Sequence, residues 1–139
     1  MHKNRRTVRV EWGHCDAAKI VYYPRYFEWF DQATHHLFET AGINLHAIAG
    51  ENGHSGAPLV NATAKFISPS RHGDDIEIES EFVELGRASF KVAHRIYNRG
   101  TLAVEGLETR VWAAVDPANP DKLKSMPIPP EMLARMKGA

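Results

Sequence analysis

The stretch that decides the fold is EWGHCDAAKIVYYPRYFEWFDQA, residues 11–33. Its second half predicts a helix over residues 24–41, because Pro24 suits a first helical turn and Gly42 suits the helix end. Side chains at three-and-four spacing form one stripe along this helix, namely Phe27, Phe30, Thr34, Leu37, Phe38 and Ala41. The first half is a loop in which one carboxylate, Asp16, stands just ahead of a segment that otherwise suits a buried core.

The remaining chain predicts short strands and turns. Strands are expected at residues 7–12, 59–67, 75–83, 89–97 and 102–115, with a shorter one near 122–126. The sequence Asn-Arg-Gly at 98–100 suits a hairpin turn. Residues 43–58 predict an irregular connection with a helical turn near Leu45–Ile48, and the tail PIPPEMLARMK predicts one or two final helical turns.

Alternation within residues 75–83 indicates a sheet with one wet face. Its inward set is Ile76, Ile78 and Phe82, and its outward set is Glu77, Glu79 and Glu81. Strands in series beside one long helix favour an α+β domain in which the helix packs on one sheet face. We therefore expect a single hotdog domain over residues 1–139, with a curved antiparallel sheet of about five strands around one long central helix.

Composition excludes several classes of protein. The chain has 139 residues, is 43% apolar, and has a formal net charge of zero, which argues against a general nucleic-acid binder. No apolar run approaches the ~18 residues of a membrane-spanning helix, and none follows the charged N-terminus, so we expect neither a span nor a secretory signal. The single cysteine, Cys15, cannot form an internal disulfide and suits the reducing cytoplasm.

Residues 11–33 closely resemble the opening of the 4-hydroxybenzoyl-CoA thioesterase family. In that family a strand runs into a loop of the form G-x-C-D-x-A-G-I-V, then two aromatic residues, a proline and the long central helix. The likeness continues more weakly through residues 56–80, GAPLVNATAKFISPSRHGDDIEIES, and 86–90, GRASF. The resemblance implies the hotdog fold, hydrolysis of acyl-CoA thioesters, and assembly as a homodimer or homotetramer.

The same resemblance implies roles for individual residues. Asp16 falls on the family's catalytic carboxylate, which attacks the thioester carbonyl or activates the water that does so. Tyr23 falls on the position whose backbone N–H polarises that carbonyl at the start of the helix. Asp31 falls on a helix carboxylate near the site, where it orients neighbouring groups. One departure from the family pattern is Lys19, which stands where the family usually has Gly.

A second departure concerns coenzyme A. The benzoyl-type enzyme has three basic residues before its Ser-Phe pair, and only Arg87 remains here, two residues ahead of Ser89. Arg87, Ser89, Lys122 and Lys124 are nevertheless the candidate contacts for the CoA phosphates. Isolated basic residues of this kind are also compatible with ordinary solvated surface.

The proposed chemistry is reasonable without the family. A helix N-terminus offers backbone donors and the positive end of a dipole to a developing oxyanion. Pro24 has no N–H, so the donor must be Tyr23 or a residue of a later turn. The structural alternatives are that Asp16 is a turn or cap residue, and that Asp31 is paired with a His or a Tyr hydroxyl.

Other polar motifs favour structural roles. His14 and Cys15 are neighbours in an extended segment and point to opposite sides, so a buried cysteine is favoured over a thiol nucleophile. His35 and His36 lack the three-or-four spacing of a helical metal pair, so we expect no metal site. Residues 55–58, SGAP, suit the acyl pocket, a subunit contact or a plain loop.

The resulting hypothesis is a cytoplasmic acyl-CoA thioesterase that takes an aromatic, 4-hydroxybenzoyl-like acyl group, with CoA present only as part of the substrate. The rings of Tyr22, Tyr23, Tyr26 and Trp29 suit stacking on such a group and equally suit a core. Three alternatives remain: a short-chain acyl-CoA thioesterase of the Tol-Pal-associated type, a hotdog protein that binds acyl thioesters without hydrolysis, and a dehydratase of the same fold.

Overall fold

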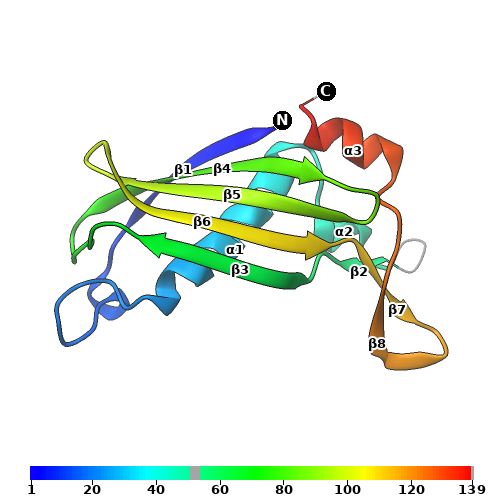
Figure 1. The fold of residues 1–139 in the computed structure, drawn as a ribbon, viewed down its shortest axis with the longest axis horizontal. Helices are drawn as coiled ribbons and strands as arrows, with labels where there is room; N and C mark the ends of the chain where they lie inside the picture. The colour runs from blue at the N-terminus through cyan, green and yellow to red at the C-terminus, as the bar shows by residue number, and fades with distance from the viewer. Residues whose placement is uncertain (51–53, 139) are drawn as a thin grey trace.

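One long helix, α1 (Pro24–Thr40), lies against a five-stranded antiparallel sheet (Figure 1). The computed structural model describes residues 1–50 and 54–138. The sheet order is β1-β4-β5-β6-β3, formed by β1 (Lys3–Arg9), β4 (Asp75–Leu85), β5 (Ser89–Asn98), β6 (Thr101–Val111) and β3 (Leu59–Phe66). This arrangement is the hotdog fold, and it confirms the predicted α+β class.

A second, smaller sheet lies at one end of the molecule. Its order is β2-β7-β8, formed by β2 (His54–Gly56), β7 (Ala113–Asp116) and β8 (Asn119–Ser125). Two short helices complete the described chain, α2 (Leu45–Ile48) and α3 (Pro130–Met136), and both agree with the predicted turns. No helix among the described residues has the length and apolar character needed to cross a bilayer.

The core lies between α1 and the concave face of the large sheet. The helix buries a broad stripe, made of Tyr26, Trp29, Phe30, Ala33, Thr34, Leu37 and Phe38. The predicted stripe was too narrow, because Tyr26, Trp29 and Ala33 are also buried while Phe27 and Ala41 are only half-buried. The ring of Phe30 approaches β6 so closely that a Cβ added to Gly106 would lie 2.5 Å from it.

The outer face of the sheet carries the predicted row of glutamates. Glu77, Glu79 and Glu81 lie opposite the β1 residues Thr7, Arg5 and Lys3 in the antiparallel register. Arg5 forms ion pairs with Glu77 at 2.7 Å and with Glu79 at 2.9 Å. Because these charges neutralise one another along the strands, the wet face is a ladder of ion pairs.

The largest differences between predicted and observed elements concern the first strand, the strand at 102–115 and the connection at 43–58. The first strand spans Lys3–Arg9 instead of 7–12, because its basic N-terminal half pairs with the glutamates of β4 and a 3-10 helix begins at Trp12. The predicted strand 102–115 is broken at Trp112, which is 1% exposed and where the chain passes from the large sheet to the small one. The predicted irregular connection includes β2, and residues 51–53 of that connection lie outside the described residues.

The hairpin turn between β5 and β6 is as predicted. Arg99 and Gly100 both have positive φ angles, of 51° and 79°. A two-residue turn with positive φ at both positions matches the right-handed twist of the strands that it joins.

Candidate active site

The loop between β1 and α1 is held in a defined shape by hydrogen bonds. In its first turn the Glu11 N–H donates to His14 Nδ1 at 2.9 Å, which closes the 3-10 helix. The Tyr22 N–H donates to the His14 carbonyl at 2.9 Å, and the Val21 N–H donates to the carbonyl of the buried Ser70 at 2.9 Å. The loop is therefore fixed to the segment that precedes β4.

Asp16 lies at the tip of this loop and is exposed in the single chain. Its N–H donates to the Ile20 carbonyl at 3.0 Å, and its carbonyl accepts from the Lys19 N–H at 2.9 Å. Its carboxylate accepts from the Ala18 N–H through Oδ1, also at 2.9 Å. Asp16 thus shapes the turn, and Oδ2 has no hydrogen bond or ion pair with any residue that the structure describes.

Tyr23 is the N-cap residue of α1, directly ahead of its first residue, Pro24. It has helical angles, with φ −54° and ψ −33°, and Pro24 follows it. The N–H of Tyr23 donates to no acceptor among residues 1–50 and 54–138. Backbone hydrogen bonds join Asp16 to Ile20 and Tyr22 to His14, so the two sides of the loop form a narrow two-stranded ribbon. The Asp16 carboxylate and the free N–H of Tyr23 both belong to this ribbon.

Two hollows adjoin this ribbon. One, of about 330 Å³, is lined by Trp12, Cys15, Asp16, Lys19, Arg71 and His72. The other, of about 280 Å³, is lined by Ile20, Val21, Tyr23, Tyr26, Phe66, Ile67, Ser68 and Pro69. Asp16 therefore lines a hollow that also has three basic side chains in its wall, and the start of the helix lines one whose residues are largely apolar.

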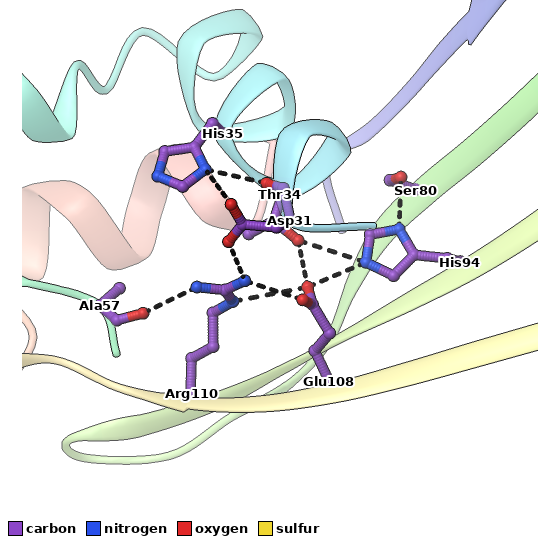
Figure 2. A network of polar contacts seen from close by, with 8 residues as sticks. All are labelled: Asp31, Thr34, His35, Ala57, Ser80, His94, Glu108 and Arg110. Carbon is purple, nitrogen blue, oxygen red and sulfur yellow. Dashed lines mark hydrogen bonds and ion pairs between the residues drawn. The ribbon is translucent and has the colours of Figure 1, made fainter. Parts of the chain in front are cut away.

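A buried polar network joins α1 to the sheet (Figure 2). His94 of β5 lies at its centre, with Nδ1 2.7 Å from the Ser80 hydroxyl and Nε2 2.9 Å from Glu108 Oε1. The Thr34 hydroxyl of α1 contacts both His94 and Glu108. The Phe30 ring stacks on the His94 ring with centroids 4.7 Å apart, so the network is enclosed by apolar groups.

Glu108 is the negative centre of this network. Burial raises the pKa of its carboxyl, but hydrogen bonds from His94 and Arg110 outweigh burial and lower the pKa to about 2. The carboxylate is therefore ionised, and its Oε1 accepts a hydrogen bond from the N–H of His94 Nε2. Burial lowers the pKa of the neighbouring Arg110 guanidinium. The interactions of Arg110 with Glu108 and Asp31 outweigh burial and raise that pKa above the ordinary value.

Asp31 connects this network to the helix surface. Arg110 Nη2 donates to Asp31 Oδ1 at 2.8 Å and to Glu108 Oε2 at 2.7 Å. Arg110 Nη1 donates to the Ala57 carbonyl at 3.0 Å, which ties the 55–58 segment to the helix. The expected partners of Asp31 were a His or a Tyr hydroxyl; His35 lies 3.9 Å from it, but the buried partner is Arg110.

The sequence-predicted residues form separate groups in one chain. Asp16 and Tyr23 share the loop, and Asp31 lies seven residues into α1, about 10 Å along its axis. Arg87, Ser89, Lys122 and Lys124 lie near the small sheet, at the opposite end of the molecule from the loop (Figure 1). Strand β5 runs between the two ends, and its nine steps from Ser89 to Asn98 span about 30 Å.

Sequence reasoning missed the buried network. Its members lie at inward-facing positions of alternating strands, and they are Ser80, His94, Glu108 and Arg110. Most residues two positions before or after them in the strand are apolar or glycine. A polar side chain at an inward position is the signal that would have pointed to them.

Among residues 1–50 and 54–138, no group of three or more His, Cys, Asp and Glu side chains is arranged to hold a metal ion.

Comparison with known proteins places the chain in a family. The family model described as the thioesterase-like superfamily matches residues 10–136. The chain belongs to this superfamily. It is 30% identical to the 4-hydroxybenzoyl-CoA thioesterase of Pseudomonas sp. (strain CBS-3) over 132 residues, which cover 90% of this chain and 91% of that protein.

Solved structures agree with this placement. The fold superimposes on an Asp-to-Asn mutant of 4-hydroxybenzoyl CoA thioesterase complexed with 4-hydroxybenzoyl CoA, with a TM-score of 0.90, 27% identity, and coverage of 98% of this chain and 99% of that one. It superimposes on BH1999 gentisyl-coenzyme A thioesterase with a TM-score of 0.83, 31% identity, and coverage of 96% and 99%. With these relatives the chain groups among the hotdog-fold acyl-CoA thioesterases.

Proposed function

We propose that this protein hydrolyses an aromatic acyl-CoA thioester, with Asp16 as nucleophile or general base. The proposal depends chiefly on the free Oδ2 of Asp16 and the free N–H of Tyr23, which belong to one rigid loop at the start of a 17-residue helix. A thioester carbonyl held at this ribbon has a carboxylate for its carbon and a backbone donor for its oxygen.

Two routes are compatible with this geometry. In the first, Asp16 attacks the carbonyl carbon, the CoA thiolate leaves, and water hydrolyses the resulting mixed anhydride. In the second, Asp16 removes a proton from the attacking water. In both, the Tyr23 N–H and the helix dipole stabilise the oxyanion, and one such donor typically lowers the barrier by about 3 kcal/mol.

Asp31 supports the site from the helix. Its carboxylate accepts a hydrogen bond from Arg110, and Arg110 also donates to the buried carboxylate of Glu108. We propose that these charged hydrogen bonds fix the position of the 55–58 segment relative to α1. The groups beside Asp31 would then be oriented for the substrate.

The acyl group is proposed to be aromatic and 4-hydroxybenzoyl-like. The relatives named above act on 4-hydroxybenzoyl and gentisyl thioesters, both of which carry a hydroxylated ring. Tyr22 and Tyr23 remain exposed beside the loop, at 48% and 58%, and are free to contact the substrate. Tyr26 and Trp29 are only 4% exposed, so they contribute to the core.

A second copy of the chain is proposed to complete the site. Strand β3 leaves one edge of the large sheet unpaired, and its segment exposes Leu59, Val60, Phe66 and Ile67. Pairing of two copies at this edge would cover that apolar surface, and assembly would allow Arg87, Ser89, Lys122 and Lys124 of one copy to meet CoA bound at Asp16 of another. We expect a homodimer or homotetramer in the cytoplasm.

The test is thiol release from a panel of acyl-CoA esters. The Asp16→Asn variant should lose most of its turnover on every ester that the wild type hydrolyses, because amides are poor nucleophiles and bases. Asp116→Asn is a matched control, since Asp116 Oδ1 accepts from the Ala118 N–H at 2.9 Å, as Asp16 Oδ1 does from Ala18. Equal turnover in wild type and Asp16→Asn would remove Asp16 from the mechanism.

A further inference from the structure

The hollow beside Asp16 has several basic side chains in its walls. Of its six lining residues, three carry basic side chains, Lys19, Arg71 and His72, and one carries the Asp16 carboxylate. The ring of Trp12 forms another wall; it is 77% exposed and meets the His72 ring edge to face at 5.8 Å. The hollow thus combines an accessible aromatic face with an excess of positive charge.

Lys19 is held in a backbone conformation that side chains avoid. Its φ is 65°, in the left-handed region, where a Cβ crowds the following carbonyl. Turns that need this conformation favour Gly, Asn or Asp. A lysine at this position therefore carries a stability penalty that the turn itself does not require, and its side chain lines the hollow.

The charged groups of the two permanent cations of the hollow form no ion pair or hydrogen bond within the described chain, although Arg71 acts on Asp74 at longer range. Ion pairs are formed by six arginines, Arg5, Arg9, Arg25, Arg95, Arg99 and Arg110. By contrast, the ammonium of Lys19 and the guanidinium of Arg71 form no ion pair or hydrogen bond with any residue that the structure describes. Asp16 is likewise outside ion-pair distance of both, so their charges are available to a ligand.

The wall that carries Arg71 and His72 is preformed. The Arg71 N–H donates to Asp74 Oδ2 at 2.8 Å, and Asn98 donates to the same oxygen at 2.9 Å. These bonds lower the pKa of the Asp74 carboxyl, so the turn is held at neutral pH. The Gly73 N–H donates to the Val10 carbonyl at 2.9 Å, which fixes the turn to the end of β1. A ligand would meet cations whose backbone is already in place.

We propose that this hollow receives the acyl group and that Lys19 and Arg71 bind a carboxylate on it. The inference rests on the proposed function: it keeps the aromatic acyl-CoA ester and specifies a carboxylate as the ring substituent in place of the neutral hydroxyl. Two cations face one carboxylate here, and a second carboxylate from the substrate brings the hollow to neutrality. Trp12 supplies a face for the ring.

An anion of CoA itself fits the hollow less well. The hollow adjoins Asp16, which must lie beside the thioester carbon, whereas the pantetheine arm separates the thioester from the nearest phosphate. The apolar hollow on the Tyr23 side is suited to that arm, since Ile20, Phe66 and Ile67 line it. The anion nearest to Lys19 is therefore expected to be part of the acyl group.

The test compares benzoyl-CoA, 4-hydroxybenzoyl-CoA and 4-carboxybenzoyl-CoA, which differ only at one ring position. We expect the wild type to have its highest kcat/KM on the carboxylated ester. Lys19→Gly and Arg71→Gln should each lower that value about tenfold or more, the loss of one charged hydrogen bond, and should lower kcat/KM on benzoyl-CoA by a clearly smaller factor. Lys137→Gln, which removes an exposed lysine after α3, is the control and should change neither.

Several outcomes would overturn the assignment. Equal kcat/KM on the three esters, or equal losses on all of them in the variants, would show that the cations do not contact the acyl group. The same acyl groups on N-acetylcysteamine carry no phosphate, so a loss of kcat/KM in Lys19→Gly that disappears with these esters would assign Lys19 to CoA. Lys19→Gly relieves backbone strain and should not melt below the wild type, so loss of folding is not the expected cause of its effect.

A binding measurement separates this inference from the proposed function. The thioethers 4-carboxyphenacyl-CoA and phenacyl-CoA cannot be hydrolysed, and calorimetry gives their affinities whether or not the protein is a hydrolase. We expect tighter binding of the carboxylated compound, lost in Lys19→Gly. If the protein binds 4-carboxyphenacyl-CoA more tightly than phenacyl-CoA but releases no thiol from any ester, the hydrolase proposal is refuted and the anion pocket stands. If the two thioethers bind with equal affinity, the anion pocket is refuted.

Discussion

The ionised Glu108 at the centre of the buried network should make a large, pH-dependent contribution to stability. Glu108→Gln keeps the shape of the side chain but removes the charge that Arg110 and His94 contact. The variant tests whether the network stabilises the fold through that charge or merely fills space.

The magnitude follows from the pKa of Glu108. Folding lowers it from 4.5 to about 2, and each pKa unit corresponds to about 1.4 kcal/mol, so the ionised carboxylate contributes about 3 kcal/mol to the free energy of unfolding at pH 7. Because the folded pKa is the lower one, this contribution is complete above pH 4.5 and is lost as the pH falls through 2. The glutamine variant lacks it at every pH.

The measurement is urea unfolding followed by tryptophan fluorescence at several pH values, since Trp29 and Trp112 are buried. Protein concentration is held constant because assembly would add to the apparent stability. The difference in the free energy of unfolding between wild type and Glu108→Gln should be about 3 kcal/mol at pH 7 and should become smaller below pH 4.5. Glu105→Gln, at an exposed position of the same strand, is the control and should produce a small, nearly pH-independent change.

A difference in the free energy of unfolding that stays the same between pH 3 and pH 7 would refute this reasoning. It would mean that the glutamine disturbs packing and that the charge of Glu108 contributes nothing. A gap well below 1 kcal/mol at pH 7 would mean that desolvation cancels the hydrogen bonds of the carboxylate.

Two further substitutions test the backbone of the fold and of the loop. Gly106→Ala places a Cβ 2.5 Å from the Phe30 ring, and because that ring stacks on His94 we expect a loss of about 1–3 kcal/mol, seen as a lower melting temperature. Gly13→Ala, where no atom lies within 4 Å of the new Cβ, should be nearly neutral, and an equal loss at both sites would contradict the steric account. Lys19→Gly should raise the free energy of unfolding by up to about 1 kcal/mol, because Gly tolerates a φ of 65°; a lower melting temperature would contradict the strain at Lys19.

Much of the fold could be predicted because its signals are local. The helix at α1 follows from Pro24, Gly42 and a period that the chain displays over five turns, and the alternation of β4 sorts Ile76 and Ile78 from the glutamates beside them. The break at Trp112 was missed because the residues on both sides of it favour strand. Only the burial of that ring and the pairing of β7 with β8 redirect the chain.

The candidate site divides in the same way. Asp16, the turn around it and the helix start at Tyr23 lie within eight residues, so bonded geometry and local hydrogen bonds place them together. Ser80, His94 and Glu108 come from three strands, and each consecutive pair is fourteen positions apart in the sequence. Their meeting depends on strand register, which no short window of sequence contains.

The sequence by itself determined that a carboxylate precedes a long aromatic helix, since turn chemistry and helical periodicity act over a few residues. Only the tertiary structure decided what faces that carboxylate. It brought Arg71 and His72, more than fifty residues further along the chain, to the hollow beside Lys19, and it put Arg87 and Lys124 at the far end of the sheet. The physical reason is that sheet order and register result from packing the whole core, and this packing sets distances between residues that are remote in the chain.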